Sequence, residues 1–198
     1  MKLVVIACNT LTVLGVDTLK GSHAFEIVGM SKGAQLVLAA SCSKKIGVFA
    51  TEFTISSGAH KAAILAADAG ADVYPQACPK FVPLIEGEQF GSAEVMSAVA
   101  EYAAPLKAAG IDTLILSCTH YPFIQKEIES EFGSEVTVID PADATAQDTK
   151  LVLAAEGLLR SEGAGSLEVC FTADVERGAR IAGRMLPQEK CRFKEIKL

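Results

Sequence analysis

Tryptophan is absent from this 198-residue sequence, and aromatic side chains make up only 6% of it. No apolar run reaches the length of about 20 residues that a membrane-spanning helix needs. The apolar stretch at residues 1–7 is also too short for a signal peptide, because Asn9 and Thr10 end it. We therefore expect no membrane partner and no secretion.

Paired metal-binding motifs and an excess of basic residues are missing as well. The six cysteines contain no CxxC spacing, which argues against a zinc site and against a disulfide framework. Free thiols are typical of the cytoplasm, so we expect a cytoplasmic protein. The net charge of −6 argues against a nucleic-acid partner held through its phosphates. We find no Gly-rich phosphate-binding loop, and we expect neither a cofactor nor a metal.

The residues that are present favour an α/β fold. Half of them are hydrophobic, and short apolar strands, loops and helical stretches follow one another along the chain. This order is typical of a largely parallel sheet, whose ligands bind at the carboxyl ends of the strands. Strands are predicted at residues 3–7, 25–29, 46–50, 113–116, 136–140 and 167–172, with a short strand and loop at 73–79. Helices are predicted at 11–19, 34–41, 60–69, 92–107, 123–128, 142–160 and 174–185.

Two cysteines have matching surroundings. Cys8 follows the apolar run at residues 3–7, Cys118 follows the one at 114–116, and hydrogen-bonding residues come directly after each thiol. A free cysteine is usually a small buried hydrophobe, and this is our interpretation of the other cysteines. The duplicated context favours a function for Cys8 and Cys118. We predict that they face each other across one substrate.

Two thiols on opposite sides of one carbon suit a particular reaction. One thiolate removes a proton from the first face, and the other thiol returns a proton to the opposite face, so the centre inverts. A polar, water-poor site can stabilise the carbanion without a cofactor. Cys118 lies at the start of a predicted helix, where the free N–H groups favour a thiolate, so a lowered pKa is expected.

Other candidates have two interpretations each. His120 could cap a helix or be satisfied in the core, or it could assist Cys118 in proton transfer. Thr51 and Thr54 follow a third predicted strand and are either N-cap residues or substrate ligands. Our interpretation of Glu86 is a charge on the surface.

Five stretches resemble those of glutamate racemases, within the aspartate/glutamate racemase superfamily. The run Cys-Thr-His-Tyr-Pro at residues 118–122 is the most specific of them. The others lie at residues 7–10, 50–55, 77–84 and 172–175.

The resemblance implies a cofactor-independent racemase that makes D-glutamate for the peptidoglycan of the cell wall. Cys8 and Cys118 would be the acid/base pair, with His120 assisting Cys118. The residues implied to hold glutamate are Asn9, Thr10, Thr51, Thr54 and Thr119. The implied fold has two pseudosymmetric α/β domains, one made of residues 1–30 and 142–198 and the other of residues 31–141, and a homodimer is compatible with it.

The sequence departs from the family pattern at its start. The family's Asp-Ser-Gly turn and Pro-Tyr-Gly loop, which precede the first cysteine motif, have no counterpart here. We therefore expect the first domain to be incomplete and racemisation to be impaired. Two alternatives stay open: a non-catalytic glutamate-binding protein, and a racemase of another amino acid such as aspartate.

Overall fold

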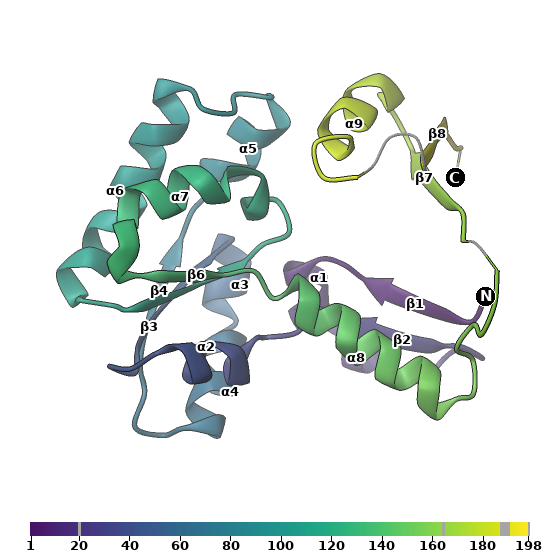
Figure 1. The fold of residues 1–198 in the computed structure, drawn as a ribbon, viewed down its shortest axis with the longest axis horizontal. Coiled ribbons are helices and arrows are strands. Elements are labelled where there is room, and N and C mark those ends of the chain that lie inside the picture. Colours follow the sequence, from purple (N-terminus) through teal and green to yellow (C-terminus); the bar gives the residue numbers. More distant parts are fainter. Residues whose placement is uncertain (20, 164, 187–190, 198) are drawn as a thin grey trace. The chain divides into compact units, whose positions relative to one another are not determined.

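The computed structural model describes residues 1–19, 21–163, 165–186 and 191–197 (Figure 1). The chain divides into two compact units, Met1–Leu159 and Arg160–Leu198. Every strand pair in the described ranges is parallel, which confirms the predicted α/β fold. Within the same ranges, no helix combines the length and the apolar character needed to cross a membrane.

A four-stranded sheet is the centre of the first unit. Its order is β4 (Asp72–Ala77), β3 (Lys45–Ala50), β5 (Thr113–Ser117) and β6 (Thr137–Ile139). The two inner strands are almost wholly buried, as expected for parallel strands covered on both faces. Pro75 lies in β4 at the edge, where a residue without an N–H group costs no ladder hydrogen bond on the open side.

Side chains from alternate positions of β5 enter different apolar clusters. Leu114 and Leu116 belong to the larger cluster, whereas Ile115 belongs to the smaller one. The larger cluster is completed by α5 (Phe81–Glu86), α6 (Ala93–Ala109), the 3-10 helix η1 (Tyr121–Ile124) and α7 (Gln125–Phe132). The smaller one takes Val37 from α2 (Ala34–Ala40) and Ile64 from α4 (Ala59–Ala67).

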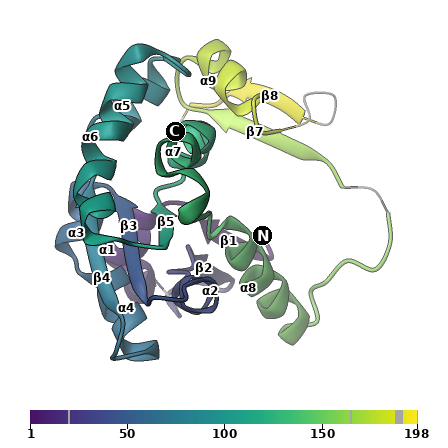
Figure 2. The ribbon, with the colours of Figure 1, turned by 60° about the vertical axis from the view of Figure 1, so that its left-hand side comes forward.

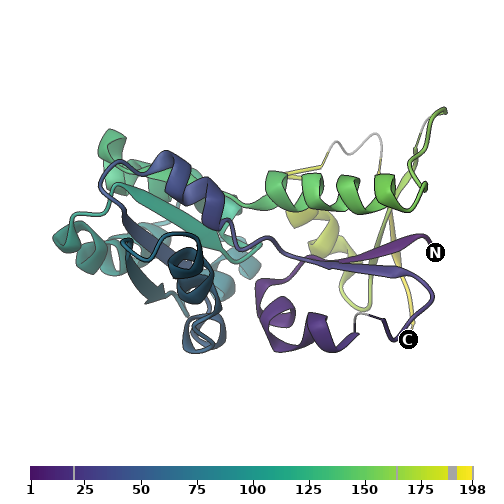
Figure 3. The same ribbon diagram turned by 90° about the horizontal axis from the view of Figure 1, so that it is seen from below.

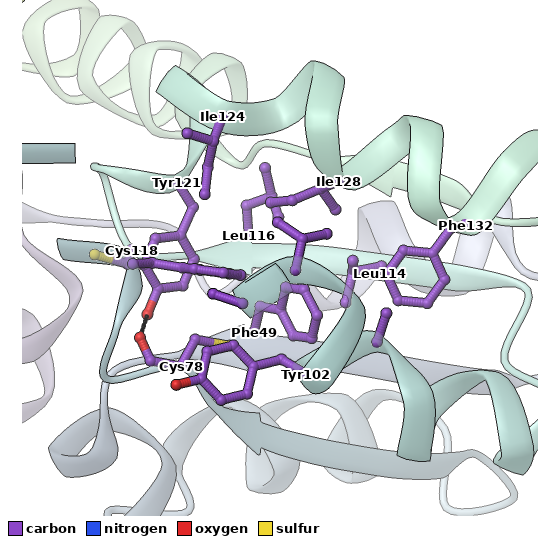
Figure 4. Packing of buried hydrophobic residues seen from close by; sticks show 14 of the residues in the cluster. Phe49, Cys78, Tyr102, Leu114, Leu116, Cys118, Tyr121, Ile124, Ile128 and Phe132 are labelled. Carbon is purple, nitrogen blue, oxygen red and sulfur yellow. Dashed lines mark hydrogen bonds between the residues drawn. The ribbon is translucent and has the colours of Figure 1, made fainter. Parts of the chain in front are cut away.

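Aromatic rings pack beneath the end of β5 (Figure 4). The rings of Phe81 and Tyr121 meet edge to face with their centroids 5.1 Å apart. The Tyr121 hydroxyl donates a hydrogen bond to the carbonyl oxygen of Cys78 at 3.3 Å. Burial of this ring raises the pKa of Tyr121. Closely packed aromatic side chains therefore support the backbone at Cys118.

The rest of the first unit holds a second, two-stranded sheet. It pairs β1 (Leu3–Ile6) with β2 (Glu26–Gly29), and α1 (Asn9–Leu19) and α8 (Ala142–Ala155) contact β2. Short helices α3 (Glu52–Ser56) and η2 (Gly133–Glu135) complete the unit.

The second unit is small. It consists of β7 (Leu167–Phe171), α9 (Val175–Ala182) and β8 (Cys191–Glu195), with the two strands parallel. A β-carbon at Gly178 would lie 2.4 Å from the Phe171 ring, so glycine permits α9 to pack closely on β7.

Several elements differ from the sequence prediction. The apolar segment Phe81–Glu86 is a helix, and β8 was not predicted. Helix α8 ends at Ala155 instead of continuing to residue 160, because Gly157 adopts a positive φ of 65° that ends the helix. The division into residues 1–30 with 142–198 and 31–141 stays a prediction.

Candidate functional site

Both motif cysteines lie at the carboxyl ends of parallel strands. Cys8 stands between β1 and the start of α1, and Cys118 directly follows β5. Burial raises the pKa of Cys118, and an electrostatic influence of Cys8 raises it further. Cys8 is half-buried and Cys118 is buried. Two-sided proton transfer requires two such groups within reach of one substrate, and the opposed placement of the thiols stays a prediction.

The lowered pKa expected for Cys118 is wrong. Burial raises the pKa of this thiol, and the nearby Cys8 raises it further. The backbone N–H groups of His120 and Tyr121 lower it, but their effect is the smaller one. Cys118 is therefore a protonated thiol at neutral pH in the free protein, because loss of water disfavours the thiolate more than the helix start favours it.

Three threonine hydroxyls from two sequence regions meet beside this site. The Thr10 oxygen lies 2.9 Å from that of Thr51 and 3.2 Å from that of Thr54, and the latter two are 3.0 Å apart. Thr51 is also the N-cap of α3, since its hydroxyl accepts a hydrogen bond from the Thr54 N–H at 3.4 Å. The N-cap interpretation of Thr51 is confirmed, and it does not exclude ligand binding.

Asn9 provides a buried donor next to Cys8. It is the first residue of α1 and is 3% exposed, and its Nδ2 has no hydrogen-bond partner among the described residues. A buried donor without an acceptor costs about 1–3 kcal/mol. An oxygen atom of a bound ligand would remove this cost. Thr119 is half-buried and directly follows Cys118.

The structure adds Glu86 to the site. His120 Nε2 lies 2.7 Å from the Glu86 carboxylate, which ends α5. If Nε2 donates its proton to Glu86, Nδ1 is left as an acceptor that can take a proton from a neighbouring group. The interpretation of Glu86 as a surface charge missed this contact. No sequence signal pointed to it, because the two residues are 34 positions apart.

We searched the described ranges for groups of side chains that could bind a metal ion. Within them, no cluster of three or more His, Cys, Asp or Glu side chains could hold a metal ion.

Comparison with known sequences identifies the family. The model for Asp/Glu/Hydantoin racemase matches residues 1–149. A glutamate racemase of Lysinibacillus sphaericus (strain C3-41) is 39% identical over 160 residues, which cover 80% of this chain and 60% of the relative. One from Herpetosiphon aurantiacus is 38% identical over 182 residues, covering 91% and 72%. The chain thus spans about 60% of the length of the first of these relatives.

Solved structures show the same fold. The glutamate racemase isoform RacE1 of Bacillus anthracis matches the whole chain and 74% of its own length, with a TM-score of 0.88 and 29% identity. The Thermus thermophilus glutamate racemase in complex with β-chloro-D-alanine also matches the whole chain, and 73% of its own length, with a TM-score of 0.77 and 31% identity. The resemblance to glutamate racemases is confirmed. The chain therefore belongs to the Asp/Glu/Hydantoin racemase family.

Proposed function

We propose that this chain interconverts L- and D-glutamate by proton transfer between Cys8 and Cys118, without a cofactor. One thiolate takes the Cα proton, and the opposite thiol gives its proton to the resulting carbanion. The S–H bond that forms on one side balances the one that breaks on the other. The observation that carries the proposal is the position of both thiols at the carboxyl ends of parallel strands, and the influence of Cys8 on the pKa of Cys118 supports it.

The protonated thiol of Cys118 supports these two roles, one thiol as base and the other as proton donor. Because burial raises its pKa, this thiol is a proton donor in the resting protein. To act as a base it must first lose its proton, and His120, oriented by Glu86 at 2.7 Å, is the group that would accept it. The contact with Glu86 can also hold the imidazole ring in the orientation that this transfer needs.

Substrate binding falls to the polar residues around the thiols. Thr10, Thr51 and Thr54 form a compact group of hydroxyls, which can donate to a carboxylate. Asn9 offers its unpartnered amide, and Thr119 follows the second thiol. We assign these five residues to the carboxylate and amino groups of glutamate. The proposed role in the cell is the supply of D-glutamate for peptidoglycan in the cytoplasm, by a monomer or a homodimer.

Circular dichroism of glutamate solutions tests the reaction directly. The purified chain is expected to abolish the optical signal of either enantiomer. In D₂O each inverted molecule should acquire a solvent deuteron at Cα, because the proton that is returned comes from a different group from the one that took the first proton. Calorimetry that detects glutamate binding without turnover would instead support the non-catalytic alternative. Faster turnover of aspartate would support a racemase of another amino acid.

Glu86→Gln tests the partner of His120. The amide keeps the shape but is a weaker acceptor for Nε2 and orients the ring less firmly, so kcat should fall about 10-fold or more, within the roughly 10²–10⁴-fold that a positioned acid–base group contributes. KM should change less, since Glu86 is not assigned to the substrate. Glu101→Gln is the matched control, because it removes an exposed carboxylate that pairs with Lys80. Equal kcat values in the two variants would contradict a role for Glu86.

A further inference from the structure

Two short segments connect the β1–β2 sheet with the four-stranded sheet (Figures 1 and 3). The first connecting segment is residues 30–33, between β2 and α2, and the second is residues 140–141, between β6 and α8. Cys8 belongs to the part that contains β1, and Cys118 belongs to the part that contains β5. The separation of the two thiols therefore depends on how these segments are held, as well as on the hydrogen bonds that Thr10 makes with Thr51 and Thr54.

One hydroxyl joins both connecting segments. Thr145 lies in the first turns of α8 and is 5% exposed. Its oxygen accepts a hydrogen bond from the Ser31 N–H at 3.0 Å and donates one to the Pro141 carbonyl at 3.0 Å. The same oxygen lies 3.9 Å from the sulfur of Met30, which is also buried. Figure 2 shows α8 and β2 from a second direction.

A second hydroxyl holds the first connecting segment to α1. The Thr12 oxygen accepts a hydrogen bond from the Met30 N–H at 3.0 Å, and it donates to the Ile6 carbonyl at 3.4 Å. A β-carbon at residue 29 would lie 2.7 Å from the Thr12 methyl, so Gly29 is what permits this approach. The amides of two consecutive residues are thus bound by side chains of two different helices, and α1 is the helix that begins beside Cys8.

The same segment also presses against β5. Gly33 has a φ of 60°, and a β-carbon there would lie 2.4 Å from the Ile115 side chain and 3.6 Å from that of Pro141. Ile115 lies in β5, which ends directly before Cys118. A series of contacts therefore runs from α1 through Thr12 and residues 30–33 to β5, and Thr145 holds residues 30–33 in this series.

We propose that Thr145 is a positioning residue for the two thiols: its hydroxyl fixes the connecting segments and thereby sets the separation of Cys8 from Cys118. The racemisation part of this inference rests on the proposed function, whereas the geometric part does not. A displacement of about 1 Å at reacting groups costs roughly 100-fold in rate. A small rotation of one part against the other would therefore be enough to impair proton transfer.

Thr145→Val isolates the hydroxyl, because valine keeps the branched shape but can neither accept from Ser31 nor donate to Pro141. Thr145→Ser restores both hydrogen bonds and is the conservative rescue. Thr149→Val is the matched control. It is the same substitution in the same helix, and it also removes a bond to the carbonyl four residues earlier, here that of Thr145 at 2.8 Å. Thr149 is bonded to neither connecting segment by its side chain.

Cross-linking measures the geometry without any assumption about activity. The folded full chain is treated with bismaleimidoethane, a short reagent that joins two thiols. The yield of the tryptic peptide pair containing Cys8 and Cys118 is then measured by mass spectrometry. We expect the yield to fall several-fold in Thr145→Val and to stay at the native level in Thr145→Ser and Thr149→Val. Racemisation should follow the same order, with kcat reduced about 10-fold or more and KM changed less.

The outcomes separate the inference from the proposed function. A native cross-link yield in Thr145→Val, while that chain remains folded by circular dichroism, overturns the positioning role. An equal loss of yield in Thr149→Val also overturns it, because the effect would then come from helix stability alone. A native chain that cross-links normally but does not racemise glutamate refutes the proposed function, and the cross-link yields alone then decide the role of Thr145.

Discussion

Replacing either Cys8 or Cys118 by alanine should lower glutamate racemisation by about 10³-fold or more. Each thiol is proposed to serve one face of the substrate, and the loss of either leaves the carbanion without a proton donor or the substrate without a base. A positioned acid–base group alone contributes roughly 10²–10⁴-fold. Because both transfers lie on the same path, the two single variants should be similarly inactive, and the double variant should be little worse.

Isotope exchange in D₂O tests each of the two thiols separately. A chain with a single remaining thiol can still remove the Cα proton that faces it and return a deuteron to the same face. Cys118→Ala should therefore exchange the Cα proton of one glutamate enantiomer without inversion, and Cys8→Ala should exchange that of the other. Nuclear magnetic resonance of the recovered glutamate measures both rates. The opposite selectivity of the two variants would assign each thiol to its face.

Cys42→Ala is the matched control for these variants. Cys42 and Cys170 are exposed, so their interpretation as buried hydrophobes is wrong. The Ser41 hydroxyl and the backbone N–H groups of Cys42 and Ser43 donate to Asp112, which lies directly before β5, at the end of the strand away from Cys118. The control should retain native activity, and all variants should be compared at equal folded fraction. A Cys118→Ala chain that racemises as fast as the control would exclude that thiol from the reaction.

The sequence was sufficient for the elements that depend on local pattern. The apolar runs of β3 and β5 are unbroken because both faces of these strands are covered, and their carboxyl ends are marked by abrupt polar residues. That change of character placed Thr51 and Cys118 correctly at strand ends. It also placed Cys8 in the equivalent position after β1.

The sequence could not show features that depend on burial in the folded chain or on contacts between residues far apart in the sequence. The pKa of Cys118 is set mainly by loss of water, which the helix-start argument ignored. Residues 81–86 form a helix although Pro83 lies within them, and this helix brings Glu86 to His120. The bond between Ser31 and Thr145 joins residues 114 positions apart, and no periodicity in the sequence predicts it.

His60 should make the folded chain sensitive to mild acid. It lies in α4 and is 3% exposed, and neither ring nitrogen has a hydrogen-bond partner among the described residues. Burial, aided by the charge of Lys32, lowers the pKa of His60 from 6.5 to about 4. The unfolded chain therefore binds a proton more readily than the folded chain between these values. Stability is full above pH 6.5 and is lost as the pH falls toward 4, by up to about 3 kcal/mol.

Urea unfolding at pH 7.5, 6, 5 and 4.5 measures this loss. In His60→Phe the part of the pH dependence between 6.5 and 4 should largely disappear, because no group at this position can then take a proton. The variant should also be at least as stable as the native chain at pH 7.5, since it buries no unpaired nitrogen. His23→Gln, at an exposed histidine, should keep the native pH dependence.

Asp112 gives this experiment an internal reference. Burial alone would raise its pKa, but hydrogen bonds from Ser41, Ser43 and Thr113 outweigh burial and hold the pKa at about 2. A depressed carboxyl pKa stabilises the fold above the ordinary value of 3.8, and this stabilisation is lost only as the pH falls from 3.8 toward 2. The pH range in which Asp112 ceases to stabilise the fold therefore lies below the pH range in which His60 destabilises it. A His60→Phe chain that loses stability between pH 6.5 and 4 as steeply as the native chain would show that other groups cause the acid sensitivity.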